Sequence, residues 1–252
     1  MNIDKKTIEE LVKIAELAGV EILKIYQQSK ITVDNKIDES PFTQADLRSE
    51  KIILSGLKKM SDYPIISEET YKNQNKSKIK NYWLVDPLDG TKDFLAKNDE
   101  FTINIALIYN YLPILGLIYI PAKKEYYWAI KGLGSYKKQT RIYNQSRRKK
   151  LIGTVSRFHH TSEDQNFFNK NSINKVVTLG AALKFCQIAE GLVDVYPRHN
   201  GSSEWDMAAG HIILKEAGCK IISLRTKKEL SYRKQSIRND FFVVSRNNLN
   251  FL

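Results

Sequence analysis

Apolar residues recur at helical spacing near the start of the chain and predict an amphipathic helix over residues 4–27. A second helix is predicted over residues 43–60, because Thr43 and Asp46 have the spacing of a capping box. Short apolar runs of strand length occur before and after this helix, at 31–33, 63–66 and 82–85.

The middle of the chain is rich in aromatic and β-branched residues and predicts strands at 101–109, 114–120 and 126–130, with a turn at 132–134. The polar stretch 137–150 is the predicted boundary between two lobes, residues 1–145 and 146–252. Beyond it strands are predicted at 151–156, 175–178, 192–196, 220–224 and 241–245, and helices at 181–189 and 206–216. This alternation favours an α/β second half.

Acidic residues stand at the ends of several of these apolar segments. Glu68 and Glu69 follow one predicted strand, Asp86 and Asp89 follow the next, and Asp206 begins a predicted helix. Carboxylate oxygens are the hard ligands that Mg²⁺ prefers, and the histidine and cysteine that softer metals prefer are absent from these stretches. The acids are therefore candidate magnesium ligands.

The segment DPLDGT combines a candidate metal site with a candidate phosphate site. A tight turn there can direct Asp86, Asp89 and the Leu88 carbonyl to one place. Gly90 lets the backbone approach closely, and Gly90 and Thr91 would present free N–H groups at the start of a short helix, where an anion is favoured. A metal beside a phosphate suggests phosphoryl transfer to water.

Each of these residues also has a purely structural explanation. DPLDG alone could be a surface turn, and Asp46 could serve only as a helix cap. Glu68 and Glu69 could be ordinary loop acids, and Asp206 could cap a helix beside a core Trp205. Because the acids fall at the ends of separate elements, which these explanations do not require, we favour a common site.

Composition narrows the classes of function. Lysine and arginine number 40 against 28 acids, a net charge of +12, but the basic residues are scattered and form one dense run, 147–150. A basic nucleic-acid-binding protein without catalysis is therefore a distant alternative, and a small anionic phosphate substrate also gains from a positive field.

The sequence also bears on location. It has two cysteines, Cys186 and Cys219, and no apolar run of the ~20 residues that cross a bilayer. Its first residues lack the continuous apolar centre of a signal peptide. We expect a cytoplasmic protein without a transmembrane segment or obligatory nucleic acid. Peripheral association with the inner membrane and the oligomeric state stay open.

The acidic motifs SEE, WLVDPLDGTKDF and EWDMAAGHI resemble those of the inositol monophosphatase superfamily of metal-dependent, lithium-sensitive phosphatases. The stretches ISEE, NDEFTINIALI, PILGLIYIPA and LKFCQIAEGLVDVYPR resemble its CysQ-type 3'(2'),5'-bisphosphate nucleotidase branch. The similarity runs from Ile8 to Ser245 and implies an α+β fold of the sugar-phosphatase type, with α-β-α-β-α layers in two lobes.

The resemblance implies two or three Mg²⁺ ions. Glu68, Asp86 and the Leu88 carbonyl would bind the first, and Asp86, Asp89 and Asp206 the second. Two such cations can activate a water and neutralise the attacking and leaving oxygens of a phosphate.

The resemblance also implies three catalytic residues. Glu69 would act through water near a third, weaker ion. Thr91, paired with Asp46, would orient or deprotonate the attacking water.

For the substrate, the resemblance implies binding by Gly90, Thr91, Gly180, Ala181, Lys184 and Asp206. Ala181 and Ala182 stand where the family often has hydroxyl residues, and residues 200–203 also depart from its pattern. Contacts near Ala181 are therefore expected from backbone N–H groups or from Lys184.

The implied reaction removes the 3'-phosphate of adenosine 3',5'-bisphosphate to give AMP and phosphate. This nucleotide is a by-product of sulfate activation, sulfonate transfer and phosphopantetheine loading. The alternative is an inositol or other sugar monophosphatase. His159 and His160 are interpreted as residues of a solvated loop, and Arg198 stays open between a substrate contact and a surface charge.

Overall fold

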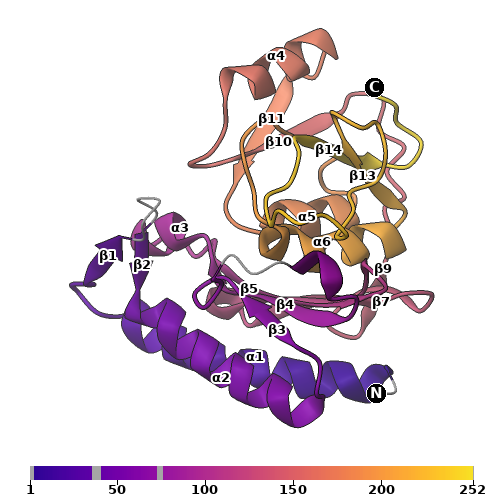
Figure 1. The fold of residues 1–252 in the computed structure, drawn as a ribbon. Coiled ribbons are helices and arrows are strands. Elements are labelled where there is room, and N and C mark those ends of the chain that lie inside the picture. Colours follow the sequence, from indigo (N-terminus) through magenta and orange to yellow (C-terminus); the bar gives the residue numbers. More distant parts are fainter. Residues whose placement is uncertain (1–2, 36–40, 73–75, 252) are drawn as a thin grey trace.

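The computed structural model describes residues 3–35, 41–72 and 76–251, and its helices and sheets form five layers (Figure 1). Helices α1 (Lys5–Tyr26) and α2 (Gln44–Met60) cover one face of a seven-stranded sheet, and α5 (Leu183–Ala189) and α6 (Glu204–Glu216) lie between it and a five-stranded sheet. Helix α4 (Ser162–Lys170) lies outside the second sheet. The expected α+β fold with α-β-α-β-α layers is confirmed.

The two sheets divide the strands by their position in the chain. The larger sheet has the order β3 (Ile65–Ser67), β4 (Tyr82–Asp89), β5 (Thr102–Tyr109), β6 (Leu112–Ile120), β7 (Glu125–Ile130), β8 (Gly134–Lys137) and β9 (Thr140–Ile142). The smaller has the order β11 (Lys175–Leu179), β10 (Ile152–Ser156), β12 (Val195–Arg198), β14 (Phe242–Arg246) and β13 (Cys219–Ser223).

Short elements complete the fold. They are the hairpin β1 (Val33–Asn35) and β2 (Pro41–Thr43), the helix α3 (Thr91–Leu95), and the 3₁₀ turns η1 (Lys76–Lys78) and η2 (Pro121–Lys123). No helix among the described residues has the length and apolarity needed to span a bilayer.

Strand β4 is buried on both faces, which explains its continuous apolar sequence. Trp83 and Val85 pack in the cluster that contains the apolar faces of α1 and α2. Tyr82 and Leu84 pack in the cluster that contains α5 and α6. Because alternate side chains of a strand face opposite sides, the sheet is held between both helix layers, and β4 carries its last residues to a fixed place.

The structure differs from several sequence predictions. The turn predicted between Asp86 and Asp89 lies inside β4, and α6 begins at Glu204, two residues before the predicted start. Strands β8, β9 and helix α4 were not predicted, because their sequences are polar and packing decides their conformation. The strands predicted at 31–33 and 192–196 lie later in the chain than predicted: β1 shares only Val33 with the first range, and β12 shares only Val195 and Tyr196 with the second.

The predicted lobe boundary between residues 145 and 146 falls between β9 and β10, the last and first strands of the two sheets. Helix α6, however, packs against β4, β5, β6 and β7 of the first sheet. The division into residues 1–145 and 146–252 therefore stays a prediction.

Candidate active site

Two acidic residues meet at the end of the β3–β4 pair because the strands run parallel. Ser67 pairs with Val85, and the Glu68 N–H donates to the Val85 carbonyl at 3.2 Å. Glu68 therefore lies beside Asp86, at the carboxyl end of both strands. The sequence pattern of an acid after each of two apolar runs anticipates this juxtaposition.

A bulge in β4 directs the next residues of the motif. The pairing with β5 passes from Asp86 opposite Asn104 to Asp89 opposite Thr102, so β4 has one residue more than its partner there. Such a bulge turns a side chain away from its regular face. The Leu88 N–H donates to Asp86 Oδ1 at 3.1 Å, and the Asn104 side-chain amide donates to Asp89 Oδ2 at 3.1 Å.

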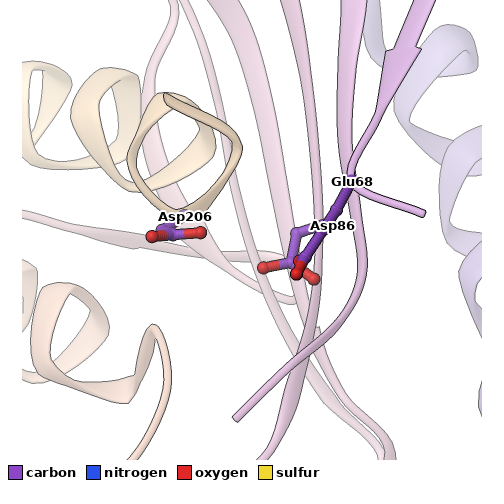
Figure 2. A group of neighbouring side chains, drawn as sticks. All are labelled: Glu68, Asp86 and Asp206. Atoms are coloured by element: carbon purple, nitrogen blue, oxygen red, sulfur yellow. The ribbon is translucent and has the colours of Figure 1, made fainter. Parts of the chain in front are cut away.

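Helix α6 brings the third carboxylate from the other half of the chain. Asp206 is the third residue of α6, and its Oδ2 accepts the Ser203 N–H at 2.7 Å in a capping box. Figure 2 shows the Asp206 carboxylate opposite those of Glu68 and Asp86. One oxygen from each of the three lies within 4.8 Å of the others.

Crowding of the acids shows in their pKa values. Burial and, after it, the charges of Asp89 and Glu68 together raise the pKa of Asp206 to about 7. Burial also raises the pKa of Asp89 to about 6, although the Lys184 charge and the Asn104 amide oppose it. The fold therefore holds these carboxylates in an arrangement that disfavours their charged forms.

A cation relieves this crowding, and the donor set fits Mg²⁺. The cluster consists of carboxylates alone, from three different elements. Their oxygens are close enough together to bind one cation. The acids of this chain thus offer the hard oxygens that Mg²⁺ requires.

Thr91 lies beside the cluster and contacts Asp46. Helix α3 begins at Thr91 after Gly90, which has the left-handed φ of 87°. The Thr91 hydroxyl lies 3.4 Å from Asp46 Oδ1 and 3.5 Å from the Leu88 carbonyl. Asp46 Oδ2 accepts the N–H and hydroxyl of Thr43, so the capping role of Asp46 and the contact with Thr91 coexist. Burial raises the pKa of Asp46 to about 6.

The acids form one side of a cavity of about 520 Å³. Its lining includes Glu68, Asp86, Asp89 and Asp206, and also Leu88, Gly90, Thr91, Ala181 and Lys184. Lys184 is buried, and its ammonium donates to the carbonyls of Leu179 and Ala181. Burial lowers the pKa of Lys184 to about 8.

Three residues with predicted roles lie outside the lining. Among the described residues, neither Glu69 nor Asp46 nor Gly180 lines the cavity. Asp46 reaches it through Thr91. The Gly180 N–H donates to Glu100 Oε2 at 2.7 Å, so it is engaged within the protein, and the substrate contact expected of Gly180 stays a prediction. The short approach of Gly180 to the Asp93 side chain and to Glu100 leaves no room for a Cβ.

The cavity also has basic residues that the sequence analysis left open or did not name. They are Lys92, His159, Arg198 and Arg238. His159 lies exposed in a turn, as predicted, and this turn borders the cavity. Desolvation and the charges of Arg198, Lys92 and Lys184 together lower its pKa to about 4. Lys92 directly follows Thr91 in the GTKDF motif, and this position could have identified it as a residue of the cavity wall.

The run 147–150, the densest basic stretch of the sequence, is in part structural. Arg148 donates to the buried carboxylate of Asp194 at 3.1 Å and to the Gly191 carbonyl at 3.0 Å. Arg246 contacts the same carboxylate and the Arg148 carbonyl. These contacts explain Arg148 without a nucleic acid.

The model of the inositol monophosphatase family matches residues 4–245. The chain belongs to this family. The resemblance drawn from the acidic motifs is thereby confirmed, and as a family member the chain shares the layered phosphatase fold described above.

Several relatives share the name "3'(2'),5'-bisphosphate nucleotidase CysQ". The protein of Buchnera aphidicola is 40% identical, over 87% of this chain and 85% of its own length. That of Escherichia coli K12 is 35% identical, over 94% of this chain and 99% of its own length. A crystal structure of CysQ from Bacteroides thetaiotaomicron is 34% identical, with a TM-score of 0.85 over 97% of this chain and 98% of that one.

Proposed function

We propose that this protein is a magnesium-dependent 3'(2'),5'-bisphosphate nucleotidase that converts adenosine 3',5'-bisphosphate to AMP and phosphate. The observation that carries the proposal is a cavity whose wall holds both carboxylates and cations. The carboxylates suit Mg²⁺, and the charges of Lys92, Lys184 and Arg198 all act on His159 in the same wall. The names and identities of the relatives support the same substrate.

The cationic side chains of the wall distinguish this substrate from a monophosphate ester. Metal ions held by the carboxylates would neutralise the phosphate that is cleaved, and a sugar monophosphate has no further charge to place. A bisphosphate has a second dianion, and the cavity favours it only where cations compensate the lost hydration. Lys92, Lys184 and Arg198 all raise the positive potential at His159, so their charges converge on one region of the wall.

Two Mg²⁺ ions would be held by Glu68, Asp86, the Leu88 carbonyl, Asp89 and Asp206, all of which line the cavity. Glu69 would lie near a third ion. When bound, the metal supplies charge neutralisation and an activated water. Lithium sensitivity and a cytoplasmic location belong to the same proposal. The location is supported by the two buried cysteines, which are both free thiols.

The protein's own residues then position the reactants. The N–H groups at the start of α3 face the cavity with Gly90 and Thr91, where they would hold phosphate oxygens. The Thr91 hydroxyl would orient the attacking water and pass a proton toward Asp46, whose Oδ1 is its acceptor. The raised pKa of Asp46 makes the carboxylate a stronger base than an ordinary aspartate.

Phosphate release from adenosine 3',5'-bisphosphate, inositol 1-phosphate and 3'-AMP at equal Mg²⁺ tests the proposal. We expect the highest kcat/KM for the bisphosphate. A variant Arg198→Met should raise KM for the bisphosphate at least about tenfold and change the KM for inositol 1-phosphate far less. Preferred turnover of inositol 1-phosphate would instead identify a sugar monophosphatase, and absence of turnover would refute both.

A further inference from the structure

A buried cluster of charges lies behind the candidate metal site. Lys76 and Glu204 have fully buried side chains, and Lys76 Nζ lies 2.6 Å from Glu204 Oε2. Lys234 approaches the other oxygen of Glu204 from the partly exposed side. Lys76 also donates to the Tyr232 carbonyl at 3.2 Å. Two lysines thus compensate one carboxylate.

Such a cluster requires an explanation beyond stability. A buried ion pair recovers only part of its desolvation cost, and well-packed apolar residues of the same volume often stabilise a fold as well or better. The ion pair instead provides a defined geometry. Separating the two charges would leave each of them buried and uncompensated, so the elements that carry them are held at a fixed distance.

The cluster connects the three elements that carry the metal-binding candidates. Glu204 is two residues before Asp206 on α6. Lys76 lies in the connection between β3, which precedes Glu68, and β4, which carries Asp86. Its ammonium also lies 5.9 Å from the ring centroid of Tyr82 in β4. The Lys76–Glu204 pair therefore joins α6 to the β3–β4 connection, and the carboxylates of the candidate metal site face one another between the same elements.

The start of α6 has one aromatic contact with the β3–β4 connection, where the rings of Trp205 and Tyr71 pack edge-on with centroids 5.5 Å apart. Hydrogen bonds hold it to its own half of the chain. The Glu204 N–H donates to the Ile237 carbonyl at 2.9 Å, and the Asn239 side-chain amide donates to the Ser203 carbonyl at 2.9 Å. These fix α6 to the segment before β14. The Lys76–Glu204 pair reaches across to the β3–β4 connection.

We propose that the cluster Lys76–Glu204–Lys234 is a positioning device that holds Asp206 at ligand distance from Glu68 and Asp86. This positioning role rests on the proposed function in one respect, the binding of Mg²⁺ by these carboxylates. None of the three residues of the cluster lines the cavity among the described residues, so they act through Asp206 and not on the substrate.

The test compares Lys76→Met with Lys76→Arg and measures Mg²⁺ binding by titration calorimetry without substrate, alongside kcat, KM and Tm. We expect Lys76→Met to weaken Mg²⁺ binding and raise the half-activating Mg²⁺ concentration at least about fivefold, with KM at saturating Mg²⁺ little changed. Lys76→Arg, which keeps the charge, should recover most of the affinity. Lys234→Met, at the partly exposed position, should weaken Mg²⁺ binding less. It replaces Lys76→Met in the test if that variant does not fold.

Arg148→Met is the matched control, because it removes a cation from the buried Asp194, which directly precedes β12 in the other sheet. It should lower Tm without changing Mg²⁺ affinity. Unchanged Mg²⁺ affinity in both Lys76→Met and Lys234→Met, or an equal loss in Arg148→Met, would overturn the positioning role. If the unmodified protein binds Mg²⁺ but does not cleave the bisphosphate, the proposed function fails, and the calorimetric comparison still decides the positioning role.

Discussion

Replacing Asp206 with Asn should stabilise the metal-free protein while it abolishes catalysis. Asp206 is partly buried, accepts the Ser203 N–H, and faces Asp86 and Glu68 across less than 4.8 Å. An asparagine oxygen can accept the same N–H, so the substitution keeps the cap and removes one charge from the cluster. In EDTA no cation offsets the remaining charges, so the variant should unfold at a higher temperature.

The pKa of Asp206 gives the scale of this effect. A rise from 3.8 to about 7 corresponds to at most about 4 kcal/mol at a pH well above 7. Solvent entry and the weaker cap reduce the gain, so we expect about 1–2 kcal/mol, or about 2–8 °C in Tm for a chain of this length. Because the folded-state pKa is raised, the parent gains stability by proton uptake as the pH falls below about 7. The advantage of the variant should therefore be full at pH 8 and smaller at pH 5.

Melting curves at pH 8 and pH 5, with EDTA or with Mg²⁺, provide the assay. Mg²⁺ at 100 times its Kd should stabilise the parent by about 2.7 kcal/mol and the variant much less. The control is Asp164→Asn, because Asp164 is also a buried carboxylate at the third position of a capped helix, where it accepts the Thr161 N–H at 2.9 Å. That substitution should not raise Tm in EDTA or alter the response to Mg²⁺.

Two results would contradict the reasoning. A variant Asp206→Asn that melts below the parent in EDTA at pH 8 would mean that the acids are not crowded as the distances indicate. A gain of equal size at pH 5 and pH 8 would mean that the charge of Asp206 is not its cause.

Three further predictions concern neighbouring residues. Thr91→Ala should lower kcat roughly 10²-fold with little change in KM, and full kcat would exclude the hydroxyl from catalysis. At saturating Mg²⁺, which keeps its ligands charged, kcat should fall as the pH drops below about 6, where Asp46 becomes protonated; a pH profile without this limb would exclude Asp46 as acceptor. Gly180→Ala should cost about 1–3 kcal/mol in chemical denaturation, because its Cβ would lie 2.6 Å from the Asp93 carboxyl carbon; an unchanged midpoint would show that the loop can move.

Much of the fold could be predicted because local signals agree with the final packing. The capping box at Thr43 and Asp46, the helical spacing of α1 and the apolar run of β4 each specify their own element. The polar hairpin of β8 and β9 has no such signal, because it forms by pairing on the edge of a sheet that already exists.

The site divides in the same way. The acids Glu68 and Asp86 could be predicted as neighbours, since each directly follows the apolar part of one of two parallel strands, whose pairing ends at Ser67 and Val85. Whether the Gly180 N–H is free to bind substrate could not be predicted, because it depends on Glu100, which is distant in sequence. Glu100 takes the Gly180 N–H, and Arg157 in turn contacts both Glu100 and Asp93.

This Arg157 network limits how the substrate loop can contribute to binding. With the Gly180 N–H engaged and hydroxyls absent from Ala181 and Ala182, the loop offers the cavity the Ala181 methyl group, which lies close to Gly90. Lys184 uses its ammonium to hold the carbonyls of the same loop. The loop therefore shapes the cavity and adds one buried positive charge. Direct hydrogen bonds to a second phosphate would come from other lining side chains, such as Lys92 and the donors of Arg198 that remain beside its contacts with Tyr196, Asn200 and Gly201. Substrate preference in this chain should accordingly respond more to changes at Arg198 than to the return of a hydroxyl at position 181.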